Sequence, residues 1–373
     1  MKIPLFRICW DEADIKAVDN VMRRGMNWSC GPEIEEFEKS IAKYTCTKYC
    51  VTFNSGTSAL HAALLAHDID SGEVIVPSFT FIATANAALF VGAKPVFADI
   101  EEKTFGLDPK DVEKRITKDT KAIIPVHYGG CPCQIEEMRR ISDENNIILI
   151  EDAAEAMGSE KGKKMVGSFG DSSVLSFCQN KIITTGEGGA VVTNNNDIYK
   201  RLKLIGSHGR EDGDYFSSGT RLDYISLGYN FRIPSMIAAL GISQLSKIDN
   251  IIKMREAAVS HYRKSLSGID EIEIPAVPIG SRNVYQLFTI VVKGDSRDEL
   301  ADYLEKNGIA SKVYFDPVHL SKFYREKFGY HGGELPVTER LAKHVMSLPI
   351  YPGISQQEIE HVSGSIKNFF NRH

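Results

Sequence analysis

The sequence predicts an α/β fold, with a large domain built on a mostly parallel sheet and a smaller α+β domain after it. Three observations lead to this prediction. The chain has 373 residues, which is more than one ordinary domain needs. Short apolar runs alternate with helical patterns up to residue 193, as in sheets that helices cover on both faces. The pattern then changes after Leu245, which indicates a second domain.

The strands of the large domain are predicted where β-branched and other apolar residues cluster. Seven such runs cover residues 50–53, 73–77, 95–99, 122–126, 147–151, 174–177 and 190–193. Helices are predicted between several of them. One of these covers residues 58–67, and another begins at Pro32, with an apolar face formed by Ile34, Phe37, Ile41 and Tyr44.

The C-terminal third has a different order of elements. The patterns there predict a long helix over 246–266, a strand over 285–292, a helix over 297–307 and a strand over 311–315. We therefore assign residues 25–245 to the large domain and 246–373 to the small one. Residues 1–24 are expected to pack against the small domain.

The composition is that of a soluble globular protein. Hydrophobic residues make up 43% of the chain and charged residues 25%, and the formal net charge is -5, so the strong positive field that attracts nucleic acid is not expected. No apolar stretch approaches the roughly 20 residues that cross a bilayer, and the start of the chain lacks the apolar core of a signal peptide. We expect a cytoplasmic protein that binds neither nucleic acid nor membranes.

The seven cysteines predict neither a disulfide framework nor a metal site. Their number is odd and no secretory signal precedes them. Cys131 and Cys133, like Cys46 and Cys50, lack the spacing of a zinc knuckle, and no second pair completes a site. We expect free thiols and no metal.

Lys181 follows the sixth predicted strand and precedes the run Gly186-Glu187-Gly188-Gly189. Open α/β sheets bind ligands outside the carboxyl ends of their strands. An amine attacks a carbonyl only when it is unprotonated, a form that burial favours. This position suggests the Schiff-base lysine of a pyridoxal phosphate enzyme, although a solvated lysine after a strand would also fit.

Three further motifs at this edge suit the same cofactor, and each also has a purely structural explanation. Residues 55–58 offer amides and hydroxyls for a phosphate, which Ser176 could also bind, but they would equally cap a helix. Asp152 ends the fifth predicted strand and could face a pyridine nitrogen or cap a helix. Phe79 and Phe81 could stack on a flat cofactor or pack in the core.

Ordered motifs extend over nearly the whole chain. They are Ser29-Cys30-Gly31-Pro32 with Phe37-Glu38, Asn54-Ser55-Gly56-Thr57-Ser58-Ala59-Leu60, Glu73-Val74-Ile75-Val76-Pro77 with Thr80-Phe81, Pro125-Val126-His127, Glu151-Asp152-Ala153-Ala154-Glu155-Ala156, Ser176-Phe177 with Lys181, Gly186-Glu187-Gly188-Gly189 and Gly228-Tyr229-Asn230-Phe231-Arg232. This series resembles the DegT/DnrJ/EryC1/StrS family of sugar aminotransferases. The resemblance implies the fold of the aspartate aminotransferase type, fold type I, and pyridoxal 5'-phosphate as cofactor.

The resemblance also implies roles for single residues. Lys181 matches the lysine that forms the internal aldimine and later moves the proton, and Asp152 matches the partner of the pyridine nitrogen. Phe81 and Ala154 match the residues on the two faces of the cofactor, and Glu155 stands near its phenolic oxygen.

The phosphate of the cofactor has its own set of implied ligands, which are Thr57, Ser58 and Ser176 of one chain and Asn230 of the neighbouring chain. The active sites are therefore expected to be shared in a homodimer. The implied reaction takes an amino group from an amino acid, usually L-glutamate, and transfers it to a nucleotide-linked keto-sugar.

The position of amination on the sugar is suggested by Phe231. In this family, an aromatic residue after Gly-Tyr-Asn resembles enzymes that act at C4, whereas enzymes that act at C3 tend to carry Ser before the Arg. Phe231 favours a 4-keto-6-deoxyhexose, and a 3-keto-sugar is the alternative.

Four residues are candidates for the substrate. Tyr314 and His319 belong to a segment that matches the family and are expected to face the sugar or its diphosphate. Trp28 and Arg232 are candidate substrate or interface residues, with a structural role equally open. Gln286 and Tyr351 depart from the family, in which histidines are common at these two positions.

Other classes of protein fit less well. A dehydratase on the same scaffold would lack the lysine, and a non-catalytic regulatory homologue would have lost members of a set that includes Lys181, Asp152, Ser176 and Thr57. A nucleotide-binding dehydrogenase or NTPase would need a glycine-rich loop that opens a helix, whereas Gly186-Glu187-Gly188-Gly189 precedes a predicted strand.

Overall fold

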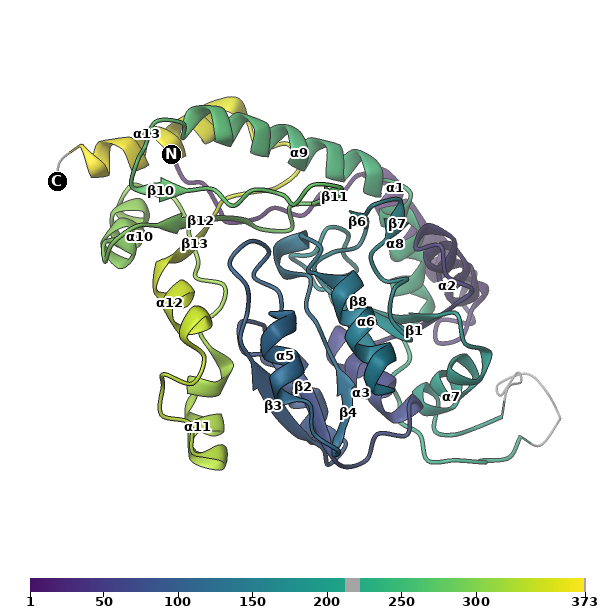
Figure 1. The fold of residues 1–373 in the computed structure, drawn as a ribbon. Helices are drawn as coiled ribbons and strands as arrows, with labels where there is room; N and C mark the ends of the chain where they lie inside the picture. The colour runs from purple at the N-terminus through teal and green to yellow at the C-terminus, as the bar shows by residue number, and fades with distance from the viewer. Residues whose placement is uncertain (212–221, 372–373) are drawn as a thin grey trace.

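A computed structural model describes residues 1–211 and 222–371 (Figure 1). Its central sheet contains the seven predicted strands in the order β1-β9-β8-β5-β4-β2-β3. The β9 strand runs antiparallel to both of its neighbours, and the other pairs are parallel. The strands are β1 (Tyr49–Phe53), β2 (Glu73–Pro77), β3 (Lys94–Ala98), β4 (Thr120–Ile123), β5 (Ile148–Asp152), β8 (Ser172–Ser176) and β9 (Gly189–Thr193). The predicted α/β class with a mostly parallel sheet is confirmed.

Helices cover both faces of this sheet, because successive strand residues point to opposite sides. On β2, Val74 and Val76 pack among the helices of one face and Ile75 among those of the other. The first face is covered by α3 (Gly56–Ala66), α4 (Ala83–Phe90) and α7 (Asn196–Gly206). The second is covered by α2 (Pro32–Tyr44), α5 (Pro109–Arg115), α6 (Ile135–Asn145) and α8 (Ser235–Leu245).

The carboxyl ends of β1, β2, β5 and β8 meet at one edge of the sheet. These four strands run in the same direction, since β9 reverses the chain between β8 and β1. Ser55, Asp152 and Ser176 lie at or just after three of these ends. The fold therefore gathers the predicted cofactor residues at a single edge.

A second unit is built on the antiparallel sheet β10-β12-β13. Its buried cluster joins residues from this sheet and from the helices around it. Its elements are α9 (Ile248–Ser265), β10 (Ile272–Glu273), β12 (Phe288–Val292), α10 (Arg297–Lys306), β13 (Val345–Leu348) and α13 (Gln356–Phe370).

The strand predicted over 311–315 does not form. Lys312 makes only an isolated bridge with Ser347. The place beside β12 belongs to β13, whose four residues are all buried, whereas residues 311–315 are part-buried or exposed. Burial on both faces therefore favours the later run, which the sequence analysis did not identify.

The helix α9 connects the two units, as the long helix across the top of Figure 1. Ile251 and Ile252 pack with the large sheet, and Val259 and Tyr262 pack with the small one. The boundary between the hydrophobic clusters of the two units therefore lies within α9. A short antiparallel sheet of β6 (Glu160–Lys161), β7 (Lys164–Met165) and β11 (Ser281–Arg282) also joins them.

The N-terminal segment contacts both units. Ile3 is 1% exposed, pairs with Ile309 and packs in the cluster of the small sheet. Farther along, α1 (Glu12–Arg24) packs against α8. Gln244 of α8 donates to Asp14 of α1 over 2.8 Å.

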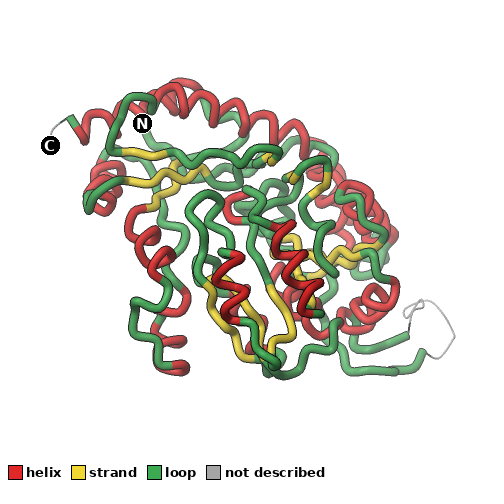
Figure 2. Tube along the Cα trace, in the orientation of Figure 1, coloured by secondary structure: helices red, strands yellow, loops and turns green. Residues whose placement is uncertain are grey.

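Two further helices, α11 (Lys322–Phe328) and α12 (Pro336–His344), extend beside the edge strand β3. Figure 2 shows them as red turns at the lower left, beside the strands of the large sheet. Tyr324 and Leu335 of this segment belong to the same buried cluster as Phe97 of β3. This part of the C-terminal region is therefore anchored on the large sheet.

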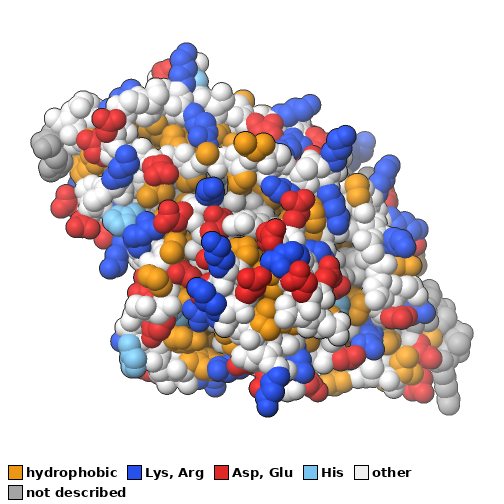
Figure 3. All heavy atoms as spheres, viewed as in Figure 1, with side chains coloured by type: hydrophobic (Ala, Val, Ile, Leu, Met, Phe, Trp, Pro, Cys, Tyr) orange, Lys and Arg blue, Asp and Glu red, His pale blue; other side chains and the backbone are white. Residues whose placement is uncertain are grey.

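The surface shown in Figure 3 carries acidic and basic side chains interspersed among polar and apolar ones. Among the residues that the structure describes, no helix is both long and apolar enough to cross a membrane.

Candidate active site

Lys181 lies in the turn between β8 and β9, with its amide bonded to the carbonyl of Cys178 over 2.9 Å. Its side chain is 15% exposed, so it is largely buried. The amine Nζ lies 3.1 Å from Oε1 of Glu155, and Oε2 of Glu155 accepts the amide of Gly129 over 2.9 Å. Lys181 and Glu155 thus form an ion pair, and the backbone amide of Gly129 holds the carboxylate in position.

Asp152 ends β5 and is buried. Its Oδ2 accepts from the hydroxyl of Thr84 over 2.8 Å, and its Oδ1 accepts from the amide of Ala154 over 3.2 Å. Burial raises the pKa of the Asp152 carboxyl above its usual range, while both hydrogen bonds and the charge of Lys181 work against that rise. The residues that follow form turns and not the helix for which Asp152 was a candidate cap.

The N-terminus of α3 approaches the end of β8 closely. A Cβ at Gly56 would lie 3.1 Å from Cβ of Ser176 and 3.2 Å from its Oγ, so a larger residue would push Ser176 away. Ser55 caps the helix by accepting the amide of Ser58 over 3.0 Å. The amides in the first turn of a helix lack partners within the helix, which makes this cradle suitable for a phosphate.

The hydroxyl of Ser58 is engaged within the protein, because it donates to Oδ1 of Asn54 over 2.7 Å. Thr57, in the same turn, is partly exposed. The structure thus brings Thr57, Ser58 and Ser176 together around the start of α3.

The two candidate stacking residues differ in burial. Phe79 is fully buried in a cluster with Phe105 and Tyr128. Phe81 is 62% exposed, which is high for a phenylalanine outside an interaction site. Phe81 is therefore the ring available to a ligand, and Ala154 is partly exposed.

Tyr314 lies near the residue that precedes the lysine. Burial raises the pKa of the Tyr314 hydroxyl, the nearby charge of Glu155 raises it further, and a hydrogen bond with the side chain of Asn180 lowers it. Its backbone carbonyl accepts from the hydroxyl of Tyr128. Tyr314 is thus close to both the residue before Lys181 and the carboxylate that holds the amine.

Three other candidates lie toward the surface. Asn230 is exposed, and its carbonyl accepts from the side chain of Asn54 over 3.4 Å. Arg232 donates to Oγ of Ser207 over 3.2 Å. Trp28 is 46% exposed, and its carbonyl accepts the amide of Ser235 over 2.7 Å. None of these side chains contacts Lys181 within the described part of the chain.

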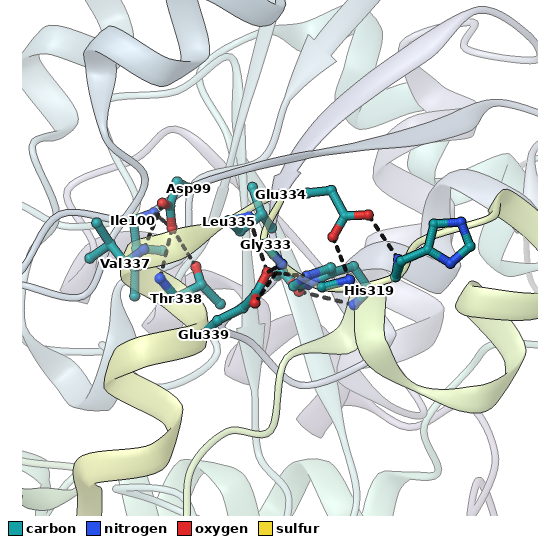
Figure 4. Close-up of polar contacts among 12 residues, drawn as sticks. Asp99, Ile100, His319, Gly333, Glu334, Leu335, Val337, Thr338 and Glu339 are labelled. Atoms are coloured by element: carbon teal, nitrogen blue, oxygen red, sulfur yellow. Dashed lines mark hydrogen bonds and ion pairs between the residues drawn. The ribbon is translucent and has the colours of Figure 1, made fainter.

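His319 is fully buried between β2 and α12 (Figure 4). Its Nδ1 lies 2.6 Å from Oγ of Ser78, and its Nε2 lies 3.2 Å from Oε1 of Glu339. Since Ser78 Oγ also accepts the backbone amide of His319 over 3.0 Å, its proton is directed at Nδ1. Both ring nitrogens are therefore occupied, which argues against the predicted contact between His319 and the substrate.

His319, Glu334 and Glu339 lie close enough together to suggest a metal site. The carboxylate oxygens are already used by the backbone, however. Glu334 accepts the amides of His331 and Gly332, and Glu339 accepts those of Gly333 and Leu335. These contacts hold the loop before α12 in place and occupy the carboxylate oxygens that would bind a cation.

Two residues that support the site were not predicted from the sequence. Thr84 holds Asp152, and the amide of Gly129 holds Glu155. Neither adjoins its partner in the sequence, so spacing could not identify them. The only sequence signal near Gly129 was the doublet Gly129-Gly130, which predicts an unusual turn. In the structure both glycines have positive φ.

A profile of the DegT/DnrJ/EryC1/StrS aminotransferase family matches residues 9–367. The chain belongs to this family. It is a pyridoxal phosphate-dependent aminotransferase of fold type I. The expectation of this family, fold and cofactor from the sequence is confirmed.

Several relatives of this aminotransferase cover nearly its whole length. GDP-perosamine synthase of Vibrio cholerae is 35% identical over 376 residues, which are 99% of each chain. The solved structure of Helicobacter pylori PseC, described as an aminotransferase of pseudoaminic acid biosynthesis, has a TM-score of 0.94 at 29% identity and covers 100% of both chains. Spr1654 from Streptococcus pneumoniae, in its PLP-form, has a TM-score of 0.93 at 27% identity over 100% of this chain and 99% of its own.

The residues at the sheet edge fit this cofactor. A glycine cradle lies at a helix N-terminus, a buried carboxylate ends β5, an exposed phenylalanine follows β2, and a largely buried lysine is paired with an acid. By their chemistry these groups suit, in that order, a phosphate, a ring nitrogen, a ring face and an aldehyde, which are the parts of pyridoxal phosphate.

Proposed function

We propose that this sugar aminotransferase transfers an amino group from L-glutamate to C4 of a nucleotide-linked 4-keto-6-deoxyhexose. The nucleotide sugar is supported by the relatives named GDP-perosamine synthase in Vibrio cholerae, Escherichia coli O157:H7 and Caulobacter vibrioides, each 35% identical. Phe231, between Asn230 and Arg232, supports position C4 through its resemblance to C4-specific members. We further propose that the enzyme acts in the cytoplasm.

The contact between Lys181 and Glu155 is the observation that carries the catalytic part of the proposal. A non-catalytic homologue would have no need for a buried amine that lies 3.1 Å from an acid at the ligand edge of the sheet. We assign Lys181 as the residue that binds the cofactor and then moves protons to and from the reacting carbon. Glu155 holds the ammonium group and can receive its proton.

The remaining side chains bind and orient the cofactor in this proposal. When bound, pyridoxal phosphate supplies an electron sink next to the amino group. Asp152 provides the negative charge that keeps its ring nitrogen protonated, and Phe81 and Ala154 contact its two faces. The phosphate is bound at the start of α3 by Thr57 and Ser176, by Ser58 once its hydroxyl exchanges Asn54 for the phosphate, and by Asn230 of a second chain in a homodimer.

The substrate side of the proposal has fewer supporting contacts. Tyr314 lies near Asn180 and Glu155 and is therefore the best placed of the candidates to contact the sugar. Trp28 and Arg232 remain candidates for the nucleotide or for the subunit interface. His319 is reassigned to the anchoring of α12 because both of its nitrogens are bonded within the chain.

A panel of nucleotide-linked 4-keto and 3-keto sugars, carrying UDP, dTDP or GDP, tests the function with L-glutamate as donor and mass spectrometry as readout. We expect a 4-amino sugar, formed from the 4-keto sugar, and 2-oxoglutarate from the wild-type protein. We expect neither product from Lys181→Ala. Borohydride treatment should fix the cofactor on the peptide that contains Lys181.

The outcomes of this experiment separate the parts of the proposal. A product from 3-keto sugars alone would refute C4 as the site of amination. Loss of the visible cofactor band with glutamate, but no aminated sugar, would refute the proposed acceptors. A Lys181→Ala protein with wild-type turnover would refute the role of the lysine.

A further inference from the structure

Gln286 is a buried residue of the C-terminal unit that contacts the loop of Lys181. It is 3% exposed and precedes β12. Its Nε2 donates to the backbone carbonyl of Asn180, the residue immediately before the lysine. The orientation of the amide is determined by this contact, because the opposite orientation would place two oxygen acceptors against each other.

Within the described part of the chain, the oxygen of the Gln286 amide has no partner, so the side chain is held by its nitrogen alone. Oε1 of Gln286 is buried without a hydrogen-bond donor among the described residues. Burying an unpaired amide oxygen costs about 1–3 kcal/mol. A leucine would avoid that cost but would leave the carbonyl of Asn180 without this donor, so the glutamine is set apart from a leucine by its contact with Asn180.

The segment around Gln286 also reaches the amine of Lys181 by a second path. The amide of Leu287 donates to the carbonyl of Gly129 over 3.2 Å. The amide of Gly129 donates to Glu155, whose carboxylate contacts the amine of Lys181. The same segment thus supports the backbone before the lysine and the acid that holds its amine.

Arg255 of α9 binds the backbone of Tyr285 and Gln286. It is 2% exposed, and its Nη1 donates to the carbonyls of Tyr285, over 2.9 Å, and Gln286, over 3.4 Å. No carboxylate of the described residues forms an ion pair with it, and its Nε has no acceptor among them. Burial lowers the pKa of the Arg255 guanidinium to about 10. A buried cation bonded only to carbonyls is costly, which indicates that the position of these carbonyls matters.

Tyr285 adds local strain at the same point. Its φ is +52°, in the left-handed region that bulky residues rarely adopt. The conformation is held by the bond from its amide to Oδ1 of Asn283, over 2.7 Å. Strained backbone that is supported on both sides is typical of segments that position functional groups.

We propose that Gln286 is a positioning residue for Lys181, which it orients by holding the carbonyl of Asn180. The residue acts through the backbone and does not touch the substrate. Arg255 keeps Gln286 in place by binding its carbonyl and that of Tyr285. The inference rests on the assignment of Lys181 as the reacting amine, and it makes the C-terminal unit part of the catalytic apparatus.

The test compares Gln286→Leu, which removes the donor at similar volume, with Gln286→Asn, which keeps an amide that is one methylene too short. Gln286→His restores an N–H donor. Tyr262→Phe is the matched control, because it removes another buried bond to a backbone carbonyl of the C-terminal unit, that of Tyr262 to Pro349 over 2.9 Å. All four proteins are assayed with glutamate alone, in the single-turnover loss of the visible cofactor band, and in cofactor-free form by hydrogen exchange.

We expect Gln286→Leu and Gln286→Asn to slow the single-turnover step about ten-fold to a hundred-fold, because small displacements of a reacting group have effects of this size. The half-saturating glutamate concentration should stay within about two-fold. The pH midpoint of the visible band should shift, and amides of residues 178–182 should exchange faster in the cofactor-free protein. Gln286→His should recover most of the rate, and Tyr262→Phe should match the wild type.

Two results would overturn the proposal. One is a Gln286→Asn protein with wild-type rate, pH midpoint and exchange. The other is a higher half-saturating concentration at unchanged rate, which would make Gln286 a substrate contact. Because the readout needs no sugar, a wrong sugar assignment leaves the test intact. A wild-type rate in Lys181→Ala would instead show that the underlying role of the lysine is wrong.

Discussion

At the scale of single residues, Asp152 shows how the site differs from the core around it. Burial raises the pKa of this carboxyl, and two hydrogen bonds only partly compensate. A carboxyl whose pKa is raised in the folded protein destabilises the fold at every pH above its unfolded value of about 3.9. The charge of Asp152 therefore lowers the stability of the fold, and we explain its presence by the ligand that it is proposed to bind.

Asp152→Asn should separate activity from stability. We expect kcat to fall about 100-fold or more, since a preorganised charge next to the reacting system is lost. The cofactor-free variant should melt at the same or a higher temperature than the wild type at pH 7. This advantage should shrink as the pH falls toward about 4, where the wild-type carboxyl also becomes neutral. A lower melting temperature at pH 7 would contradict this account, and calorimetry of both cofactor-free proteins decides it.

The sequence could predict which types of residue stand at the ligand edge, but not how each is buried. From position alone Phe79 and Phe81 were equivalent candidates, and only the family resemblance favoured Phe81; the difference in burial between the two rings comes from packing. His319 matched a family motif, yet its ring is enclosed by Ser78 and Glu339, which lie 241 and 20 positions away in the sequence. Such contacts depend on tertiary structure and leave no local pattern.

At the scale of elements, the attachment of α12 relies on two sets of side chain to backbone contacts (Figure 4). Asp99, just after β3, accepts the amides of Val337 and Thr338 in the first turn of the helix over 2.9 and 2.8 Å. Glu339 accepts the amides of the preceding loop and contacts His319. Acidic groups at a helix N-terminus are favourable, so this end of α12 is fixed to the large sheet from both sides.

This attachment should depend on pH through His319. Burial lowers the pKa of His319, although the contact with Glu339 opposes the shift. A histidine with a lowered pKa adds stability above its unfolded value of about 6.5, and this stability is lost as the pH falls below it. His319→Asn should reduce the free energy of unfolding at pH 7.5 by about 1–3 kcal/mol and should flatten its decrease toward pH 5.5.

Urea unfolding at several pH values measures both effects. His67→Asn is the matched control, because burial lowers the pKa of His67 to about 4 and its ring contacts Ser172 and not α12. Both variants should flatten the pH dependence, but only His319→Asn should speed hydrogen exchange in α12. Parallel stability curves for His319→Asn and the wild type would refute the role of this histidine.

The order of elements was largely predictable, and the exceptions have physical reasons. Each strand of the central sheet is a short apolar run because it is covered on both faces, so all seven could be recognised. In the small sheet, burial and not composition selects β13 over residues 311–315. The helix α1 was not predicted. It packs on α8 with Val21 buried, and the buried Asp14 on α1 accepts from Gln244 of α8.

At the scale of the whole molecule, the surface around Asn230 is where we propose that a second chain binds. Tyr229 and Phe231 stack with ring centroids 4.7 Å apart, and His61 links them to Phe90, which is 50% exposed. Ile225 and Leu227, earlier in the same segment, are 58% and 82% exposed. Exposed apolar residues in such number mark an interaction surface, and Asn230 lies within it.

Mixed dimers provide the test of a shared active site. Lys181→Ala removes the amine, and Asn230→Ala should slow the reaction about ten-fold to a hundred-fold by removing a hydrogen bond to a charged phosphate. In a heterodimer of the two variants, one site would combine Lys181 from one chain with Asn230 from the other. Under two-fold symmetry it should therefore recover about half of the wild-type activity per dimer. Purification through two different affinity tags isolates this species. If Asn230 instead serves the site of its own chain, the heterodimer contains no intact site and its activity stays at the level of the two parent variants.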